Sequence, residues 1–181
     1  MKYNIDTYGC QMNTADTQLL ASELERMGHH AAENEQEADI FVENTCVVRQ
    51  AAEDKAMNRL HVLKHLKRDK PDTVIGLMGC MVGVKDPLHM RKKLPFVDVF
   101  LPPSQPAPMV NFLKDRGWES EALENEYAAR LMRDAIQDGD MILPTHETGS
   151  LISAHVPVVF GCSHACTFCI IPFRRGVDQQ W

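Results

Sequence analysis

The sequence predicts the α/β fold class, with a mainly parallel, Rossmann-like sheet in its N-terminal part, and three observations support this. Apolar segments of strand length alternate with amphipathic segments of helix length over the first 116 residues, which is the pattern of βαβ units. Residues 73–79 form a continuous apolar run of the kind found in strands buried on both faces of a sheet. Gly28 and Pro71 stand where the first two helical patterns end, as helix stop signals.

The expected elements follow one another with short connections. In the first helical pattern, Leu19, Leu20 and Leu24 lie on one face, as in an amphipathic helix that packs on a sheet. The strands are expected at residues 2–8, 38–45, 73–79 and 96–102, and the helices at residues 14–27, 48–69 and 106–114.

A change of composition after residue 116 divides the chain into three regions. Residues 1–116 form the predicted α/β domain. Residues 117–150 are acidic and helix-prone at first and then rich in turn residues, so we interpret them as a connecting segment. Residues 151–181 are expected to begin a second domain, opening with a strand at residues 155–161.

The composition indicates a soluble, cytoplasmic protein. The net charge of −6 and the pI near 5.7 argue against bulk electrostatic capture of nucleic acid, although a local basic patch is compatible with them. The chain has no apolar run of membrane-spanning length and opens without the apolar core of a secretory signal. Cytoplasmic thiols stay reduced, so the six cysteines indicate metal or redox chemistry before disulfides.

Three of the cysteines each follow a predicted strand directly. They are Cys10, Cys46 and Cys80. The carboxyl ends of parallel strands meet at one edge of a sheet, where α/β proteins bind their ligands, so we expect these thiols to converge. The alternative is that all three are ordinary buried cysteines, which behave as small apolar residues.

The other three cysteines lie within a single short loop. Cys162, Cys166 and Cys169 form a CxxxCxxC motif directly after the predicted strand at residues 155–161. Thiolates are the ligands of iron–sulfur clusters. Zinc bound by three thiolates and one imidazole is the alternative, with His155 or His164 as the fourth ligand.

The motifs together resemble those of the radical S-adenosylmethionine methylthiotransferases. "GCSHACTFCIIPFRRG" at 161–176 resembles the radical motif of that family, including the aromatic Phe168 before the last cysteine. "GCQMN" at 9–13, "NTCVVRQAAEDKA" at 44–56 and "GCM" at 79–81 resemble its amino-terminal domain. Gln11, Met12 and Asn13 resemble the branch that acts on isopentenylated adenosine in transfer RNA.

The resemblance implies two [4Fe–4S] clusters and S-adenosyl-L-methionine as cofactors. It places an auxiliary cluster on Cys10, Cys46 and Cys80, and the radical-generating cluster on Cys162, Cys166 and Cys169, with Phe168 beside the cofactor. The implied reaction is methylthiolation of N6-isopentenyladenosine in transfer RNA at adenine C2. The implied partners are transfer RNA, a sulfur donor protein and an electron donor protein, and the protein is expected to be a monomer without a membrane association.

One departure from the family concerns the second domain. The family has a complete barrel after the radical motif and then a small RNA-binding domain, whereas this sequence ends at Trp181, so we expect only the start of a truncated radical barrel and no activity of the chain alone. Two other functions therefore stay open. One is an iron–sulfur or sulfur-delivery module without radical chemistry, and the other is a zinc-binding structural protein.

Six further residues are weighed as site candidates. His61 and His65 are four apart on the second predicted helix, but the lysines around them indicate a solvated helix face rather than a zinc site. Arg174 and Arg175 follow the second cysteine loop and face either the active site, RNA phosphates or ordinary solvent. Asn13 and Asn44, which flank cysteines, are interpreted as orienting groups or as helix caps.

Overall fold

The computed structural model describes residues 1–85, 87–118, 144, 147, 159–164, 166–177 and 179–180. Its core is a five-stranded parallel sheet in the order β2-β1-β3-β4-β5. The elements are β1 (Lys2–Thr7), α1 (Gln11–Arg26), β2 (His30–Ala31), η1 (Glu35–Glu37), β3 (Ile40–Thr45), α2 (Gln50–Asp69), β4 (Val74–Gly79), α3 (Leu88–Lys93), β5 (Val99–Leu101), α4 (Ala107–Asp115), β6 (Val159–Phe160), α6 (Ile171–Arg175) and β7 (Gln179–Gln180).

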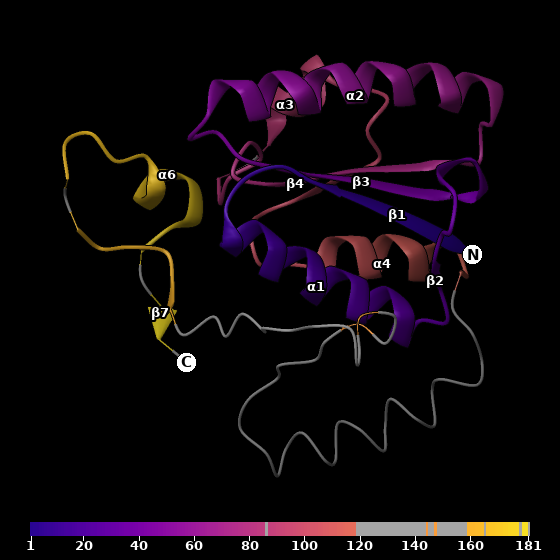
Figure 1. Cartoon of the computed structure of the whole chain (residues 1–181), viewed down its shortest axis with the longest axis horizontal. Helices are drawn as coiled ribbons and strands as arrows, with labels where there is room; N and C mark the ends of the chain where they lie inside the picture. Colours follow the sequence, from indigo (N-terminus) through magenta and orange to yellow (C-terminus); the bar gives the residue numbers. More distant parts are fainter. Residues whose placement is uncertain are drawn as a thin grey trace, which may run out of the picture.

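The sheet is doubly wound, with helices on both faces. α1 and α4 cover one face, and α2 and α3 cover the other (Figure 1). The strand order is the flavodoxin-like one, in which the chain runs outward from β1 to β2 and then returns to β3 on the other side of β1. This reversal places the topological switch point between β1 and β3, at the carboxyl edge of the sheet.

Each helix packs through the apolar residues that its sequence spaces along one side. In α2, Ala56, Leu60 and Leu63 are fully buried, whereas Val62 is 55 % exposed. The buried residues of α2 pack with Phe41 of β3 and with other side chains of that face of the sheet. On the opposite face, α1 and α4 pack on a second apolar cluster, so both faces of the sheet are buried.

The structure confirms the predicted parallel α/β fold. The predicted strands and helices of the first 116 residues are all present, although α1 begins at Gln11, immediately after Cys10. The short elements β2, η1 and α3 were not predicted, because two to six residues are too few to show a periodic pattern.

The predicted second domain is described only in part. The helix-prone stretch at residues 119–137 and most of the strand predicted at 155–161 lie outside the described residues. Within the described residues of the C-terminal region, β6 pairs with β7 in antiparallel orientation, which does not show the start of a parallel barrel. No helix in the described part of the chain is long and apolar enough to cross a membrane.

Candidate functional site

Cys10, Cys46 and Cys80, the first cysteine set, lie in the turns that follow β1, β3 and β4, and these turns meet at the carboxyl edge of the sheet. Register pairs Thr7 with Asn44 and Thr45 with Gly79, so the residues that follow β1, β3 and β4 come out side by side. Two backbone hydrogen bonds extend these ladders beyond the strands, from Tyr8 N to Asn44 O at 2.8 Å and from Cys80 N to Thr45 O at 2.9 Å. The three turns thus lie next to one another at this edge of the sheet.

Two glycines allow these turns to approach closely. Gly9 has a φ of +142°, and a Cβ atom at this position would lie 2.7 Å from Cys46 Cβ. Gly79 has a φ of +95°, and a Cβ atom there would lie 2.5 Å from Asn44 Oδ1 and 2.6 Å from Thr45 O. Only glycine combines this backbone conformation with this proximity, so both residues are required for the turns to pack together.

The three thiols differ in exposure. Cys46 and Cys80 are buried, and Cys10 is exposed at the start of α1. Burial raises the pKa of the Cys80 thiol, while the neighbouring Arg175 guanidinium opposes this shift. Among the described residues, no three His, Cys, Asp or Glu side chains are grouped closely enough to hold a metal ion as they stand.

Asn13 and Asn44 contribute buried amides directly behind the first cysteine turn. Asn13 Oδ1 accepts hydrogen bonds from Cys10 N at 3.3 Å and from Cys10 Sγ at 3.4 Å. Asn44 Nδ2 donates to Asn13 O at 2.7 Å and to Thr17 Oγ1 at 2.9 Å. Asn13 therefore both caps α1 and orients Cys10, and Asn44 supports it from β3.

Arg175 reaches this edge from the C-terminal region. Its Nη2 lies 2.9 Å from Asp16 Oδ2, and the two side chains are only 6 % and 2 % exposed. The guanidinium also lies near the Cys80 thiol, where its positive charge opposes the rise that burial causes in the pKa of that thiol. Its neighbour Arg174 instead lines a separate hollow of about 360 Å³ together with Lys85 and Lys93. The two adjacent arginines thus lie in different environments: Arg175 pairs with Asp16, whereas the hollow of Arg174 is lined by Val47 and Met81, which follow Cys46 and Cys80.

The second cysteine loop begins at Gly161 and folds back on the residues that follow it. Cys162 N donates to Gly176 O at 3.0 Å, and Cys169 N donates to Cys166 O at 3.1 Å. Cys162 and Cys169 are partly buried, whereas Cys166 is exposed. Phe168 is 91 % exposed, so its ring is available to a partner or ligand.

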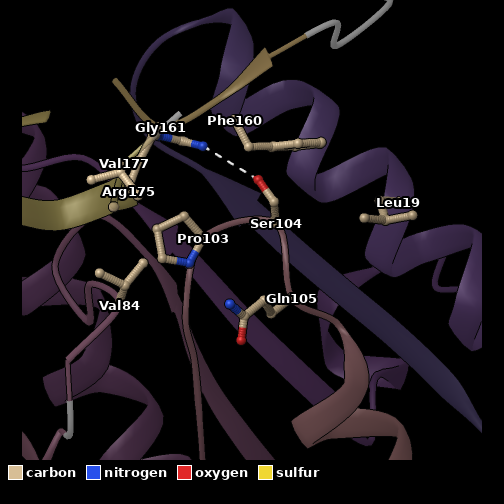
Figure 2. A pocket seen from close by; sticks show the side chains of 10 residues that line it. Leu19, Val84, Pro103, Ser104, Gln105, Phe160, Gly161, Arg175 and Val177 are labelled. Atoms are coloured by element: carbon tan, nitrogen blue, oxygen red, sulfur yellow. Dashed lines mark hydrogen bonds between the residues drawn. The ribbon is translucent and has the colours of Figure 1, made fainter. Parts of the chain in front are cut away.

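A cavity of about 550 Å³ lies between α1, the turn after β5 and the C-terminal region. Figure 2 shows Ser104 and Arg175 among its lining residues, together with apolar side chains such as Leu19, Pro103 and Phe160. The cavity therefore borders both halves of the described chain.

The structure leaves the predicted histidine candidates outside the site. His61 and His65 are exposed on the outer side of α2, and His61 Nδ1 contacts Met57 O at 2.7 Å, which supports a solvated helix face. His164 is exposed, and His155 lies outside the described residues.

Asp16 and Ser104 were not singled out from the sequence, and neither was a charged cluster on the α2 face. Glu43 of β3 is fully buried, 3.7 Å from Arg59 Nε, which also lies 3.1 Å from Asp6 Oδ2. Burial, reinforced by the Asp6 carboxylate, raises the pKa of Glu43 to about 8. A glutamate inside an apolar strand pattern was the available signal.

The described residues thus form a doubly wound α/β domain that carries three cysteines at the carboxyl edge of its sheet. The chain belongs to the uncharacterized protein family UPF0004, whose model matches residues 2–102. This match covers the sheet and all three strand-end cysteines of the first set.

Named relatives extend the similarity to nearly the whole chain. The tRNA-2-methylthio-N(6)-dimethylallyladenosine synthase of Herpetosiphon aurantiacus is 35% identical over 179 residues, covering 99% of this chain and 37% of the relative. The synthases of a Thermoanaerobacter species and of Staphylococcus saprophyticus are 35% and 36% identical and are covered over 36% and 33% of their length. The resemblance to methylthiotransferases is thereby confirmed, and the chain spans little more than a third of these relatives.

Proposed function

We propose that this chain takes part in methylthiolation of N6-isopentenyladenosine in transfer RNA at adenine C2 by radical S-adenosylmethionine chemistry. The observation that carries the proposal is the meeting of the three strand-end cysteine turns at one sheet edge, where the C-terminal region adds Arg175 next to Cys80. The names of the relatives, which match over 97–99% of this chain, support transfer RNA as the substrate.

The donor sets fit iron–sulfur clusters by their chemistry, since all six are thiols, and the described thiols would have to move closer together to hold one. Thiolates are the standard protein ligands of such clusters, and the close approach of Gly9 to Cys46 brings two of the turns into contact. Cys10, Cys46 and Cys80 would hold one [4Fe–4S] cluster. Cys162, Cys166 and Cys169 would hold the other, with S-adenosyl-L-methionine and the exposed ring of Phe168 beside it.

When bound, the two clusters would supply electron transfer to S-adenosylmethionine and a place to hold sulfur. The protein's own part is to bind and orient them. Asn13 and Asn44 set the direction of the first turn through their hydrogen bonds. Burial of Cys46 and Cys80 keeps water away from two of the ligands, which favours a stable thiolate–metal bond over exchange.

The remaining partners follow from this chemistry. Sulfur insertion consumes sulfur and electrons, so a sulfur donor protein and an electron donor protein would serve the enzyme, which we propose acts as a cytoplasmic monomer. An iron–sulfur or sulfur-delivery module without radical chemistry is the second candidate, because the meeting of the Cys10, Cys46 and Cys80 turns at one sheet edge would serve it equally. A zinc-binding structural protein is the third.

Anaerobic reconstitution with iron and sulfide tests these functions on the chain itself. The proposed function requires about eight irons and matching sulfide per chain, four for each cubane cluster. Cys46→Ser and Cys166→Ser should each remove about half of the iron, because each belongs to a different set. If each variant lost all of its iron, the two cysteine sets would not form separate sites. If the chain bound zinc and no sulfide, the result would favour a zinc-binding structural protein.

A further inference from the structure

One buried ion pair joins two segments that lie far apart in the sequence. Arg175 of α6 and Asp16 of α1 are separated by 159 positions, yet Arg175 Nη2 lies 2.9 Å from Asp16 Oδ2. Their side chains are 6 % and 2 % exposed, which makes this the most buried ion pair in the described part of the chain. A charge that leaves water in this way persists only where its partner is held in place.

Ser104, in the turn between β5 and α4, hydrogen-bonds both members of this ion pair. Its Oγ donates to Asp16 Oδ1 at 2.6 Å. It also accepts from Arg175 Nη1 at 3.5 Å, the bond drawn in Figure 2. Ser104 also has a φ of +60°, and in the described part of the chain it is the only residue other than glycine with a positive φ. Such a conformation is costly for serine and persists where the surroundings enforce it.

The same guanidinium lies near the Cys80 thiol and interacts with it electrostatically. Arg175 is therefore close to one member of the first cysteine set, and it lies six residues after Cys169 of the second set. Figure 1 shows α6 beyond the edge of the sheet at which β1, β3 and β4 end. Among the described residues, Arg175 is the side chain that links the two cysteine-bearing regions through a buried charge.

We propose that Arg175 is a positioning residue whose pair with Asp16 fixes the loop of Cys162, Cys166 and Cys169 against the sheet edge that carries Cys10, Cys46 and Cys80. The fork of the guanidinium suits this task, since it bonds the Asp16 carboxylate and the Ser104 hydroxyl at once. The assignment of the two cysteine sets rests on the proposed function, but the docking itself is measurable without any metal.

Hydrogen exchange on the metal-free chain, read by mass spectrometry of peptides, tests the docking. In Arg175→Gln and in Asp16→Asn, we expect residues 159–177 to exchange about tenfold faster or more, because one buried charge is left without its partner. Arg68→Gln removes an arginine whose partner Asp69 is also exposed, so it should leave this segment unchanged. Faster exchange confined to α1 and the turn after β5 would show a local structural role and would overturn the proposal.

Two further variants separate a specific pair from general destabilisation. The double variant Asp16→Asn with Arg175→Gln should exchange no faster than either single variant, because its second change removes a group that is already unpaired. Arg175→Lys keeps the charge but not the fork, so it should restore part of the protection. The pairing role would be overturned if the increases in exchange rate of the two single variants multiplied in the double variant. It would also be overturned if Arg175→Lys exchanged as fast as Arg175→Gln.

The peptides of β3 and β4 report the folding of the sheet in the same experiment. If a single variant loses protection there, its sheet is destabilised as a whole. The exchange rates of Arg175→Lys and of the double variant then decide the result. Failure of this proposal is also distinguishable from failure of the proposed function. A wild-type chain that binds no iron contradicts the cluster assignment, whereas unchanged exchange at residues 159–177 in Arg175→Gln contradicts the docking whether or not iron binds.

Discussion

Asn13 Nδ2 donates a hydrogen bond to Asn44 Oδ1 at 3.0 Å, and both side chains are fully buried behind the first cysteine turn. Asn13 Nδ2 also donates to Thr45 O at 3.0 Å. Together with the bonds from Asn44 back to α1, this leaves both amides satisfied, which is the condition under which buried polar groups stabilise a structure. The pair therefore ties the start of α1 to the end of β3.

Replacing Asn44 should break this network. We expect Asn44→Ala to lower the free energy of unfolding by about 2–4 kcal/mol, because the change removes several bonds and leaves a buried amide of Asn13 underpaired. Asn58→Ala, on the exposed side of α2, should change it by less than about 0.5 kcal/mol. Urea denaturation followed by circular dichroism measures both, and equal effects would contradict the network.

The backbone at Gly79 should not tolerate a side chain. Gly79→Ala would bring a Cβ atom within 2.6 Å of Asn44 Oδ1 and of Thr45 O at a φ of +95°, so both a clash and backbone strain arise. We expect a loss of about 3 kcal/mol or more in the free energy of unfolding.

Gly117→Ala is the matched control for this change. Gly117 also has a positive φ, but a Cβ atom there meets nothing within 4 Å. Only the backbone cost of about 1–2 kcal/mol should remain. If the two alanine variants had the same stability in urea denaturation, the close packing at the strand ends would not be the cause of the loss.

Stability should depend on pH through Glu43. Burial, together with the Asp6 carboxylate, raises the pKa of Glu43 in the folded state from its ordinary 4.5 to about 8. The folded state therefore binds this proton more tightly than the unfolded state, and the stabilisation present below pH 4.5 is lost as the pH rises towards 8.

Glu43→Gln should flatten this dependence. Between pH 6.5 and 8, the free energy of unfolding of the wild type should fall more steeply than that of the variant, by up to about 1.4 kcal/mol per pH unit. This window avoids His29, whose pKa burial lowers to about 4. Asp6→Asn should move the decline to lower pH, and identical slopes for wild type and Glu43→Gln in urea titrations would contradict the prediction.

Truncation to alanine should cost very different amounts of stability at two adjacent positions of α2. Leu63 is fully buried against the sheet, so Leu63→Ala should cost about 2–5 kcal/mol through lost burial and a cavity. Val62 is 55 % exposed, so Val62→Ala should change stability by less than about 0.5 kcal/mol. Thermal unfolding compares the two, and a similar loss at both would contradict the packing of α2.

The strand-end cysteines show how far local pattern reaches. Each follows a segment of strand length, and these segments, with a helix between successive ones, place Cys10, Cys46 and Cys80 after the ends of β1, β3 and β4. Their position at strand ends could be predicted because the periodicity of a strand or a helix is visible within a few neighbouring residues. The two-residue strand β2 and the resulting flavodoxin-like order were not accessible in this way, since so short a strand has no period.

The parallel α/β sheet, the faces of its main helices and the cysteine motifs shared with its relatives can all be read from the amino-acid sequence, because they depend on spacing along the chain. The folded chain was needed to show that Arg175 turns inward to Asp16 while Arg174 lines another hollow. It also showed that Glu43 is buried among charged neighbours. Such pairings depend on which segments the fold brings together. Arg175 and Asp16 are 159 positions apart, and nothing in that separation shows that they meet.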